Sequence, residues 1–484
     1  MKKPMERLRA IRVSKDDSED SQPLSPVARV FHQPHNVYII IIMGFKTPIN
    51  PLSFKVSLRH SLLKHPRFSS LHVVEKDGEM RWVRTEVNLD NHVRFPVLDP
   101  KMESPDKFVE DYASNLTKTP ISKSIPLWDV HLLNVKTSEA ESTGLFRIHH
   151  SLGDGISLMS LILSCTRKVS DPEACPTIPT IKRRNPSNSG GFWEFLLKLW
   201  WLVLLCWNTI VDGLIFLGTI FFLEDTKTPL RGSLPLEATQ RRFVHRTISL
   251  NDVKFLKNVM GTTINDVMVA ITQAGLSSYL NRKYDDDKKD NKGAEENNNN
   301  LPNNIRLRAA LMVNVRPSAG IQAFDDMMKR DSEARWGNQI ACVLLPFTIA
   351  LHDDPLDYVR NAKVVGDRKK ATLEAKLNYL VAIFSPKYFI DKIMSKFPSR
   401  ITLWFSNLPG PEEKISYFGH PVTFIAFGVY GQPNALIIHV VSYANKMKIT
   451  LSVDDNIIAD PHQLCDDLQN SLVLMKHAVR NLIF

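Results

Sequence analysis

The sequence predicts an α+β fold in two domains, and three observations support this. The chain has 484 residues, whereas a single hydrophobic core seldom grows beyond roughly 250 to 300 residues. Hydrophobic residues make up 43% and charged residues 23% of the chain, which is typical of a globular protein and excludes a wholly disordered or fibrous one. Strand-like and helix-like segments also mix without the repeating βαβ period of a parallel sheet.

The first 24 residues are expected to form a flexible tail. They are rich in charge, and no apolar stretch occurs before Val37. The segment therefore lacks the hydrophobic region of a cleaved secretory signal.

An N-terminal domain is expected at 25–180. The apolar, β-branched run 37–43 is typical of a strand, and 71–87 contains two strand-like pieces around a Lys-Asp-Gly turn. Apolar residues in 57–63 and 107–116 are spaced as in helices.

A linker is expected at 181–235, because the chain first turns polar and basic and then becomes strongly apolar at about 192–223. Within it, the stretch 199–223 is long enough to span a bilayer, which takes about 20 apolar residues. Asp212 falls in its middle, however, where a charge costs roughly 3 kcal/mol on insertion scales. We expect a helical hairpin or an interfacial segment; a true membrane span and a buried core helix are the alternatives.

The C-terminal domain is expected at 236–484. The segment 264–279 has a helical pattern, and 307–315 is a strand candidate. The segment 285–300 (DDDKKDNKGAEENNNN) is polar and of low complexity, so it predicts a disordered surface loop.

The charge and the cysteines narrow the function classes. Lysine and arginine exceed aspartate and glutamate by ten, which suits an anionic membrane surface or a phosphorylated substrate such as CoA. The basic residues are scattered and follow no nucleic-acid-binding motif, so no nucleic-acid partner is expected. Five widely spaced cysteines without a CxxC pair indicate a reducing, cytosol-facing fold and no metal site.

The motif that carries chemistry is His149-His150-Ser151-Leu152-Gly153-Asp154-Gly155. It lies between a strand-like stretch and a helix-like run, so we expect it at a strand-to-helix corner that presents His150 to a cleft. Histidine is suited to act as a general base because its ordinary pKa is near 6.5. Gly153 and Gly155 are expected to adopt backbone conformations closed to other residues. Asp154 either orients the imidazole or fixes the loop through an ion pair; the sequence leaves both open.

HHxxxDG is the signature of the CoA-dependent acyltransferase superfamily, and the chain resembles the plant wax ester synthase/diacylglycerol acyltransferase family over most of its length. Six further segments look like ordered landmarks of that family: SPVARVF (25–31), PLWDVHLL (126–133), TINDV (263–267), NVRP (314–317), WGNQ (336–339) and SNLPGP (406–411).

The resemblance implies two similar α+β domains of the CoA-dependent acyltransferase type, with the active site at their interface. It implies an O-acyltransferase that makes wax esters from long-chain fatty alcohols, and triacylglycerol from diacylglycerol, with acyl-CoA as co-substrate and no bound cofactor. His150 would deprotonate the acceptor hydroxyl. The membrane of the endoplasmic reticulum, with the plasma membrane as a second location, would then be a partner, and the catalytic domains would face the cytosol.

Other roles implied by the resemblance are assigned residue by residue. Asn265, Ser406 and Asn407 are candidates to stabilise the oxyanion or position the substrate, with helix and turn capping as the alternative. Arg316 is a candidate partner of Asp154. Independently of the resemblance, His149 is expected to be a packing or orienting neighbour and not a second base, because adjacent residues at a strand end point to opposite faces.

Two other functions stay open from the sequence. One is a BAHD-like transferase acting on other alcohols, although the nearest string to its DFGWG motif, at 427–431, does not match. The other is a catalytically inactive lipid-binding protein, which the intact His150 and Asp154 disfavour.

Overall fold

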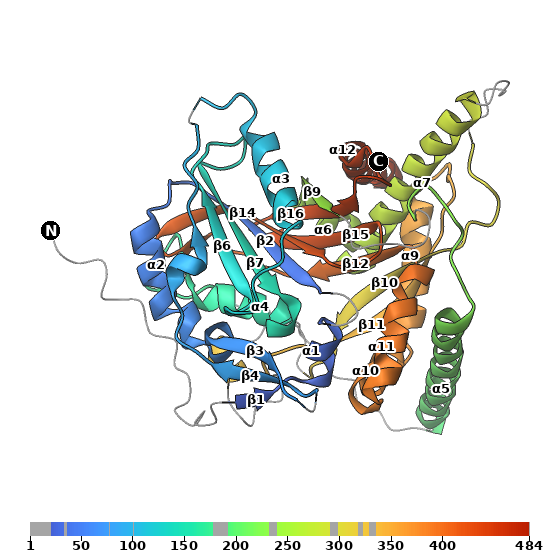
Figure 1. Cartoon of the computed structure of the whole chain (residues 1–484). Coiled ribbons are helices and arrows are strands. Elements are labelled where there is room, and N and C mark those ends of the chain that lie inside the picture. Colours follow the sequence, from blue (N-terminus) through green and yellow to red (C-terminus); the bar gives the residue numbers. More distant parts are fainter. Residues whose placement is uncertain are drawn as a thin grey trace.

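The computed structural model describes residues 21–32, 36–76, 78–99, 101–177, 192–231, 240–290, 299–317, 323–328 and 335–483. Helices and three sheets are mixed along this part of the chain, so the predicted α+β class is confirmed (Figure 1). Residues 1–20 of the expected tail, the segment 178–191 and residues 291–298 of the expected loop lie outside the described residues.

The first large sheet has seven strands. Their order across the sheet is β5 (Val93–Arg94), β6 (Trp128–Leu133), β7 (Ser142–His149), β2 (Tyr38–Phe45), β14 (His420–Tyr430), β13 (Ile415–Tyr417) and β8 (Thr166–Lys168). A small sheet of β1 (Ser21–Pro23), β4 (Met80–Arg84) and β3 (Ser70–Val74) lies beside it. We call these two sheets and their helices the first half of the molecule. The helices are α1 (Pro26–Val30), α2 (Pro51–His60), α3 (Pro105–Leu116) and α4 (Gly155–Ser164).

The second large sheet has six strands. Their order is β11 (Ile340–Phe347), β10 (Leu307–Asn314), β12 (Leu403–Leu408), β15 (Leu436–Tyr443), β16 (Lys446–Asp454) and β9 (Arg241–Ser249). Its apolar core is shared with α6 (Leu250–Val259), α7 (Ile264–Asp290), α9 (Leu356–Lys370) and α12 (Pro461–Ile483). The short helix α8 (Phe324–Met327) and the pair α10 (Glu374–Phe384) and α11 (Lys387–Lys396) complete this half.

The two sheets do not divide the chain at one point. β14 pairs antiparallel with β2 from Tyr430 opposite Tyr38 to Val422 opposite Phe45, so a late segment of the chain completes the first sheet. The next strand, β15, belongs to the second sheet. This crossing places the ends of β14 and β15 next to each other, between the two sheets.

Local sequence explains where several elements begin and end. The run predicted as a strand at 37–43 is β2, which is buried on both faces. The helix predicted at 57–63 is wrong in position: α2 begins at Pro51, because the Asn50 side chain accepts hydrogen bonds from the N–H groups of Leu52 and Ser53, and it ends at His60.

The expected disordered loop 285–300 is wrong at both ends. The backbone continues as helix α7 to Asp290. Two ion pairs hold this helix in place: Arg282 pairs with Asp467 of α12, and Lys283 pairs with Asp460, directly before α12. At the other end, the N–H of Asn300 donates to Asn281 at 2.7 Å, and Asn300 is buried.

The apolar segment forms one helix, α5 (Phe192–Phe221), so the helical hairpin is wrong. No break is needed at Asp212, because its carboxylate is buried and lies 2.7 Å from Arg368 and 3.1 Å from Lys369. The helix lies along the outside of α10 and α11 (Figure 1) with most of its surface exposed, so it is not a buried core helix. Among the described residues it is the one helix long and apolar enough to cross a membrane.

Candidate active site

The HHxxxDG motif lies at the corner between β7 and α4. β7 ends at His149, a 3₁₀ turn covers His150–Leu152, and α4 begins at Gly155. The N–H of His149 donates to Leu127 and that of His150 to Val37, each at 2.9 Å. These bonds fix the corner to the neighbouring strands of the first sheet.

His150 is 8% exposed and faces the space between the two large sheets. Its ring stacks on that of Phe31, with centroids 3.8 Å apart. Burial lowers the pKa of His150 below its ordinary value. The imidazole is therefore neutral at pH 7, which is the state that a general base requires.

Asn338 holds the imidazole in one tautomer. Its amide NH₂ donates to the carbonyls of His150, at 3.0 Å, and Ser151, at 3.3 Å. The amide oxygen therefore faces Nδ1 of His150, at 3.1 Å, and a carbonyl oxygen can only accept. Nδ1 must carry the proton, so Nε2 is left as the basic nitrogen.

Four consecutive residues of the second half clamp the motif. Trp336 Nε1 donates to Leu152 O at 2.8 Å. Gly337 exchanges hydrogen bonds with the Ser157 hydroxyl, Asn338 binds His150, and the N–H of Gln339 donates to Asp154 at 2.9 Å. Sequence analysis identified this WGNQ segment as a landmark but assigned it no role; nothing in its pattern indicated that it would lie on the motif.

Asp154 is fully buried, and none of the hydrogen bonds that its carboxylate accepts from the described residues comes from His150. Its side chain caps α4 by accepting from the N–H of Ser157 at 2.9 Å. Arg316 donates to both of its oxygens, at 2.8 and 3.1 Å. The arginine named from the sequence as its candidate partner thus forms a bidentate ion pair whose side chains are both 0% exposed.

His149 points away from His150. Its Nδ1 lies 2.7 Å from Ser151 Oγ and its Nε2 lies 2.8 Å from Asn36 Oδ1, while its ring stacks against His32. Burial holds the pKa of His149 well below the ordinary value. Both ring nitrogens are engaged, which leaves none free to act on a substrate.

A cavity of about 230 Å³ lies in front of His150. Both halves line it: Phe31, Ile39 and Ile156 come from the first, and β10, β11, β12 and β15 of the second contribute Asn314, Cys342, Ser406, Asn407 and His439. The lining is mainly apolar, with a few polar groups near the imidazole, as expected for a site that binds a long hydrocarbon chain.

The three oxyanion candidates are placed differently. Ser406 and Asn407 line the cavity, on β12. Asn265 is half-buried near the start of α7 and is not among the lining residues. The adjacent Asp266, which accepts from the N–H and hydroxyl of Thr263 at 3.1 and 2.7 Å, organises that helix start.

His439 is a cavity residue that sequence analysis missed. It lies on β15 opposite Ser406 of β12, and its buried Nδ1 has no hydrogen-bond partner among the described residues. Burial and, to a lesser extent, the nearby His150 lower its pKa to about 3. A histidine within the apolar run 436–441 was the one available signal.

The expected backbone role of the two glycines is wrong. Gly153 has an extended φ of 175°, which any residue adopts, and Gly155 begins α4. Space is the reason for the first glycine, because a Cβ there would lie 3.1 Å from the Trp336 ring and 3.2 Å from Ser157 Cβ. A Cβ on Gly155 would meet only ordinary contacts with Leu408.

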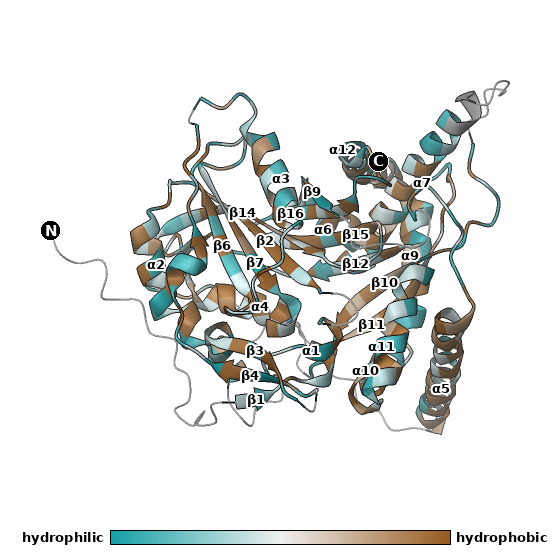
Figure 2. Ribbon diagram, viewed as in Figure 1, coloured by the Kyte–Doolittle hydropathy of each residue, from teal (hydrophilic) through white to brown (hydrophobic). Residues whose placement is uncertain are grey.

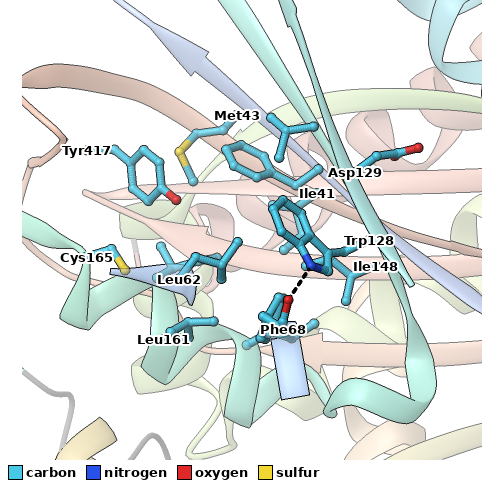
Figure 3. A pocket seen from close by; sticks show the side chains of 14 residues that line it. Ile41, Met43, Leu62, Phe68, Trp128, Asp129, Ile148, Leu161, Cys165 and Tyr417 are labelled. Carbon is cyan, nitrogen blue, oxygen red and sulfur yellow. Dashed lines mark hydrogen bonds between the residues drawn. The ribbon is translucent and has the colours of Figure 1, made fainter. Parts of the chain in front are cut away.

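A second, much smaller cavity of about 30 Å³ lies inside the first half, between the sheet and α4 (Figure 3). Trp128 of the PLW string fills one side and donates from Nε1 to Phe68 O at 2.9 Å. The tryptophan is buried in the core. His150 does not line this cavity, which is a packing space of the core.

Two family models match the chain. Residues 42–206 match the wax ester synthase/diacylglycerol acyltransferase catalytic domain, and residues 336–476 match the WS/DGAT C-terminal domain. Among curated relatives, wax ester synthase/diacylglycerol acyltransferase 11 of Arabidopsis thaliana is 46% identical over 96% of both chains. Number 4 of the same plant is 45% identical over 96% of this chain and 92% of its own length.

Solved structures share the fold. The wax ester synthase/diacylglycerol acyltransferase from Marinobacter aquaeolei VT8 matches with a TM-score of 0.60 and 16% identity, over 95% of this chain and 100% of its own. A variant of the starter condensation domain of rhizomide synthetase, in complex with C8-CoA and Leu-SNAC, matches with a TM-score of 0.55 and 13% identity, over 95% of both chains.

Proposed function

Since this chain belongs to the wax ester synthase/diacylglycerol acyltransferase family and is an acyl-CoA-dependent O-acyltransferase, we propose that His150 is the general base of a direct acyl transfer. The observation that carries this proposal is the buried imidazole in the cavity between the two halves, whose Nδ1 lies 3.1 Å from Asn338 Oδ1. This contact leaves Nε2 as the basic nitrogen. The products are wax esters when the acceptor is a long-chain fatty alcohol, and triacylglycerol when it is diacylglycerol.

The transfer proceeds in one displacement. Nε2 of His150 takes the proton of the acceptor hydroxyl as its oxygen attacks the carbonyl carbon of the acyl-CoA thioester. The C–S bond then breaks, and the CoA sulfur leaves as a thiolate that accepts the proton from the imidazolium. The ester and CoA are the products, and no covalent enzyme intermediate forms.

The negative oxygen of the tetrahedral intermediate requires hydrogen-bond donors. Ser406 and Asn407 line the cavity near the base, and His439 lies opposite Ser406. A pKa of about 3 keeps His439 neutral, so one of its ring nitrogens carries an N–H and the ring adds no positive charge to the site. We assign oxyanion stabilisation to this polar strip on β12 and β15, in place of Asn265.

We assign Asp154 and Arg316 a structural role. The carboxylate accepts from Arg316, Ser157 and Gln339, and its oxygens have no remaining position facing the imidazole. Through Gln339 and its neighbour Asn338, the ion pair positions the group that sets the tautomer of His150. Asp154 therefore acts on the base through the shape of the loop.

The acceptors dissolve in lipid, and α5 presents a long apolar surface, so we place the enzyme at a membrane surface. The endoplasmic reticulum, with both halves on the cytosolic side where acyl-CoA is made, is the location that we propose. A cavity lined from both halves requires them to lie on the same side of the membrane.

The test is a transfer assay on the purified chain in membranes. Labelled acyl-CoA is supplied with either hexadecanol or diacylglycerol, and the products are separated by thin-layer chromatography. We expect labelled wax ester from the first acceptor and labelled triacylglycerol from the second, both absent with His150→Ala. A wild-type protein that transfers to neither acceptor would contradict the proposed function.

A further inference from the structure

Three neighbouring helices, α5, α10 and α11, expose apolar side chains on the outside of the molecule. On α5 the exposed set includes four tryptophans: Trp193 (76%), Trp200 (59%), Trp201 (60%) and Trp207 (64%). On α10 and α11 it includes Leu377, Leu380, Phe384, Tyr388 and Phe389. Figure 2 shows α5 as a nearly continuous hydrophobic helix beside α10 and α11. We call the exposed surface of these three helices the apolar face.

The apolar face is fixed to the protein from behind. Asp212 of α5 pairs with Arg368 and Lys369 at the end of α9. Asn208 donates to the carbonyl of Ala371 at 3.0 Å, and the hydroxyl of Thr209 accepts from the N–H of Leu373 at 3.0 Å. The side chains of Asn208, Thr209 and Asp212 therefore point inward to the protein, which leaves the tryptophans outward. Glu194 and Lys198, near the start of α5, pair with each other at the surface. An apolar outer side on a helix fixed to the protein from behind suits a position along a membrane surface.

The same ion pair argues against a crossing helix. Asp212 lies in the C-terminal half of α5, near the middle of the apolar stretch 199–223. Its partners lie beside Lys370, which is 53% exposed and pairs with Asp367. If α5 crossed a bilayer, this group of charges at the end of α9 would lie near the bilayer midplane, where charged side chains are strongly disfavoured. With α5 along the surface, the charges stay on the protein side.

The helices of the apolar face also form a wall of the substrate cavity. Phe216 of α5, Val381 and Ala382 of α10, and Ile390 and Ile393 of α11 line it. On α10 the two faces are one turn or less apart: Val381 faces the cavity while Leu380 and Phe384 face outward. One layer of side chains and helices therefore separates the cavity from the outside at this place.

Charge at the face favours an anionic membrane. The exposed charged residues of α10 and α11 are the four lysines Lys376, Lys387, Lys392 and Lys396, whereas the carboxylate residue Asp391 of α11 is half-buried. None of these ammonium groups has a carboxylate partner in an ion pair among the described residues. Aromatic side chains flanked by lysines are typical of segments that lie at the level of lipid headgroups.

We propose that the apolar face lies in the headgroup region of an anionic phospholipid bilayer, with α5 parallel to the surface. The acceptor alcohol then enters from the lipid through the wall formed by α5, α10 and α11, and its hydroxyl reaches His150 without passing through water. This inference rests on the proposed function, because it takes the acceptor to be a lipid. Beyond the proposed function, it specifies which face meets the membrane, how α5 is oriented there and how the acceptor alcohol enters.

The first test is flotation of the full chain with vesicles. Phosphatidylcholine vesicles, with and without phosphatidylserine, are mixed with wild type, with a face variant and with a control variant. The face variant carries Leu380→Asp, Phe384→Asp and Tyr388→Asp, three residues that are 48%, 79% and 77% exposed. The control carries Leu52→Asp, Val473→Asp and Leu474→Asp, exposed apolar residues of α2 and α12.

We expect the face variant to partition at least about tenfold less into vesicles, while the control floats as wild type does. Replacing Lys387, Lys392 and Lys396 by glutamine should remove most of the gain from phosphatidylserine, at roughly fivefold per lysine. Equal flotation of the face variant and wild type would overturn the proposal, as would an equal loss in the control. A third outcome would also overturn it: the face variant floats normally, but light scattering shows an oligomer for wild type and a monomer for the variant. The apolar face would then bind a second copy of the chain.

The second test separates the route from the chemistry. Transfer from acyl-CoA is measured to hexadecanol held in vesicles and to hexanol dissolved in buffer. The face variant should lose at least about tenfold with the first acceptor and keep the wild-type rate with the second. Undiminished transfer to hexadecanol in vesicles would overturn the entry route. If wild type transfers to neither acceptor, the proposed function fails, and flotation alone decides the docking face.

Discussion

Replacing Asp154 by asparagine is expected to destabilise the protein and not only to slow the reaction. The buried carboxylate accepts four hydrogen bonds, two from Arg316 and one each from the N–H groups of Ser157 and Gln339. Asparagine keeps the size of the side chain, but its NH₂ group must face at least one of these donors. Arg316 is then a buried cation without its counter-ion.

The structure sets the size of the effect. Breaking a buried ion pair by removing one partner costs about 3–5 kcal/mol. The entropy of unfolding is about 2.1 cal/mol/K per residue, so a chain of 484 residues gains about 1 kcal/mol/K on unfolding. The melting temperature of Asp154→Asn should therefore fall by about 3–5 °C, and activity should fall as the loop that holds His150 loosens.

The assay is thermal unfolding followed by tryptophan fluorescence, with three matched variants. His150→Ala changes the same loop without leaving a buried charge, so it should melt within about 1 °C of wild type. Arg316→Met should be destabilising by itself. The double variant should be clearly more stable than the sum of the two single changes predicts, because no charge is left unpaired in it.

One result would refute this division of roles. If Asp154→Asn melts as wild type does, and loses activity with an altered pH profile, the carboxylate acts in proton transfer. Additive single changes in the double variant would also contradict it, since they would mean that Asp154 and Arg316 do not stabilise each other.

Three further predictions concern the base, the oxyanion and the topology. His150→Ala should lower the transfer rate by roughly 10²- to 10⁴-fold. Because burial lowers the pKa of His150, the wild-type rate should stay level as pH falls through 6.5 and decline only at lower pH. A decline centred above pH 6.5 would contradict this. His439→Leu should lower kcat by roughly 10²- to 10³-fold with little change in KM for acyl-CoA. His439→Gln keeps an N–H and should retain part of the rate. Equal rates in wild type and His439→Leu would show that His439 does not stabilise the oxyanion. In a protease-protection experiment on sealed microsomes, sites on both sides of α5 should be cut from the cytosolic side, and lumenal protection of the chain after residue 235 in an active monomer would rule out a shared cavity.

The sequence predicted the parts of this fold that depend on local patterns. The continuous β-branched run of β2 indicates a buried strand by itself. The helical spacing of α3 and the proline at its first helical position indicate a helix. The family resemblance added the α+β pairing of two halves. The start of α2 is also encoded locally, by the capping residue Asn50 and by Pro51. Apolar spacing alone places this helix too late in the chain.

Features that depend on distant partners could not be predicted. Asp212 suggested a break in the apolar segment only because Arg368 and Lys369, more than 150 residues later in the chain, were not known to pair with it. The return of β14 to the first sheet gives no local signal either, since a strand's sequence does not state which edge it joins. The same holds for His439, which lines the same cavity as His150 although it lies 289 residues later in the chain.

The clamp of residues 336–339 on the motif has a consequence for how the two halves work together. The imidazole that we propose as the base comes from the first half, and Asn338 of the second half sets which of its nitrogens is basic. A first half alone would present His150 in either tautomer and without the Asp154–Arg316 pair that shapes its loop. On our proposal, His150 becomes the base only when residues 336–339 lie against the motif, which ties activity to the interface that also encloses the cavity.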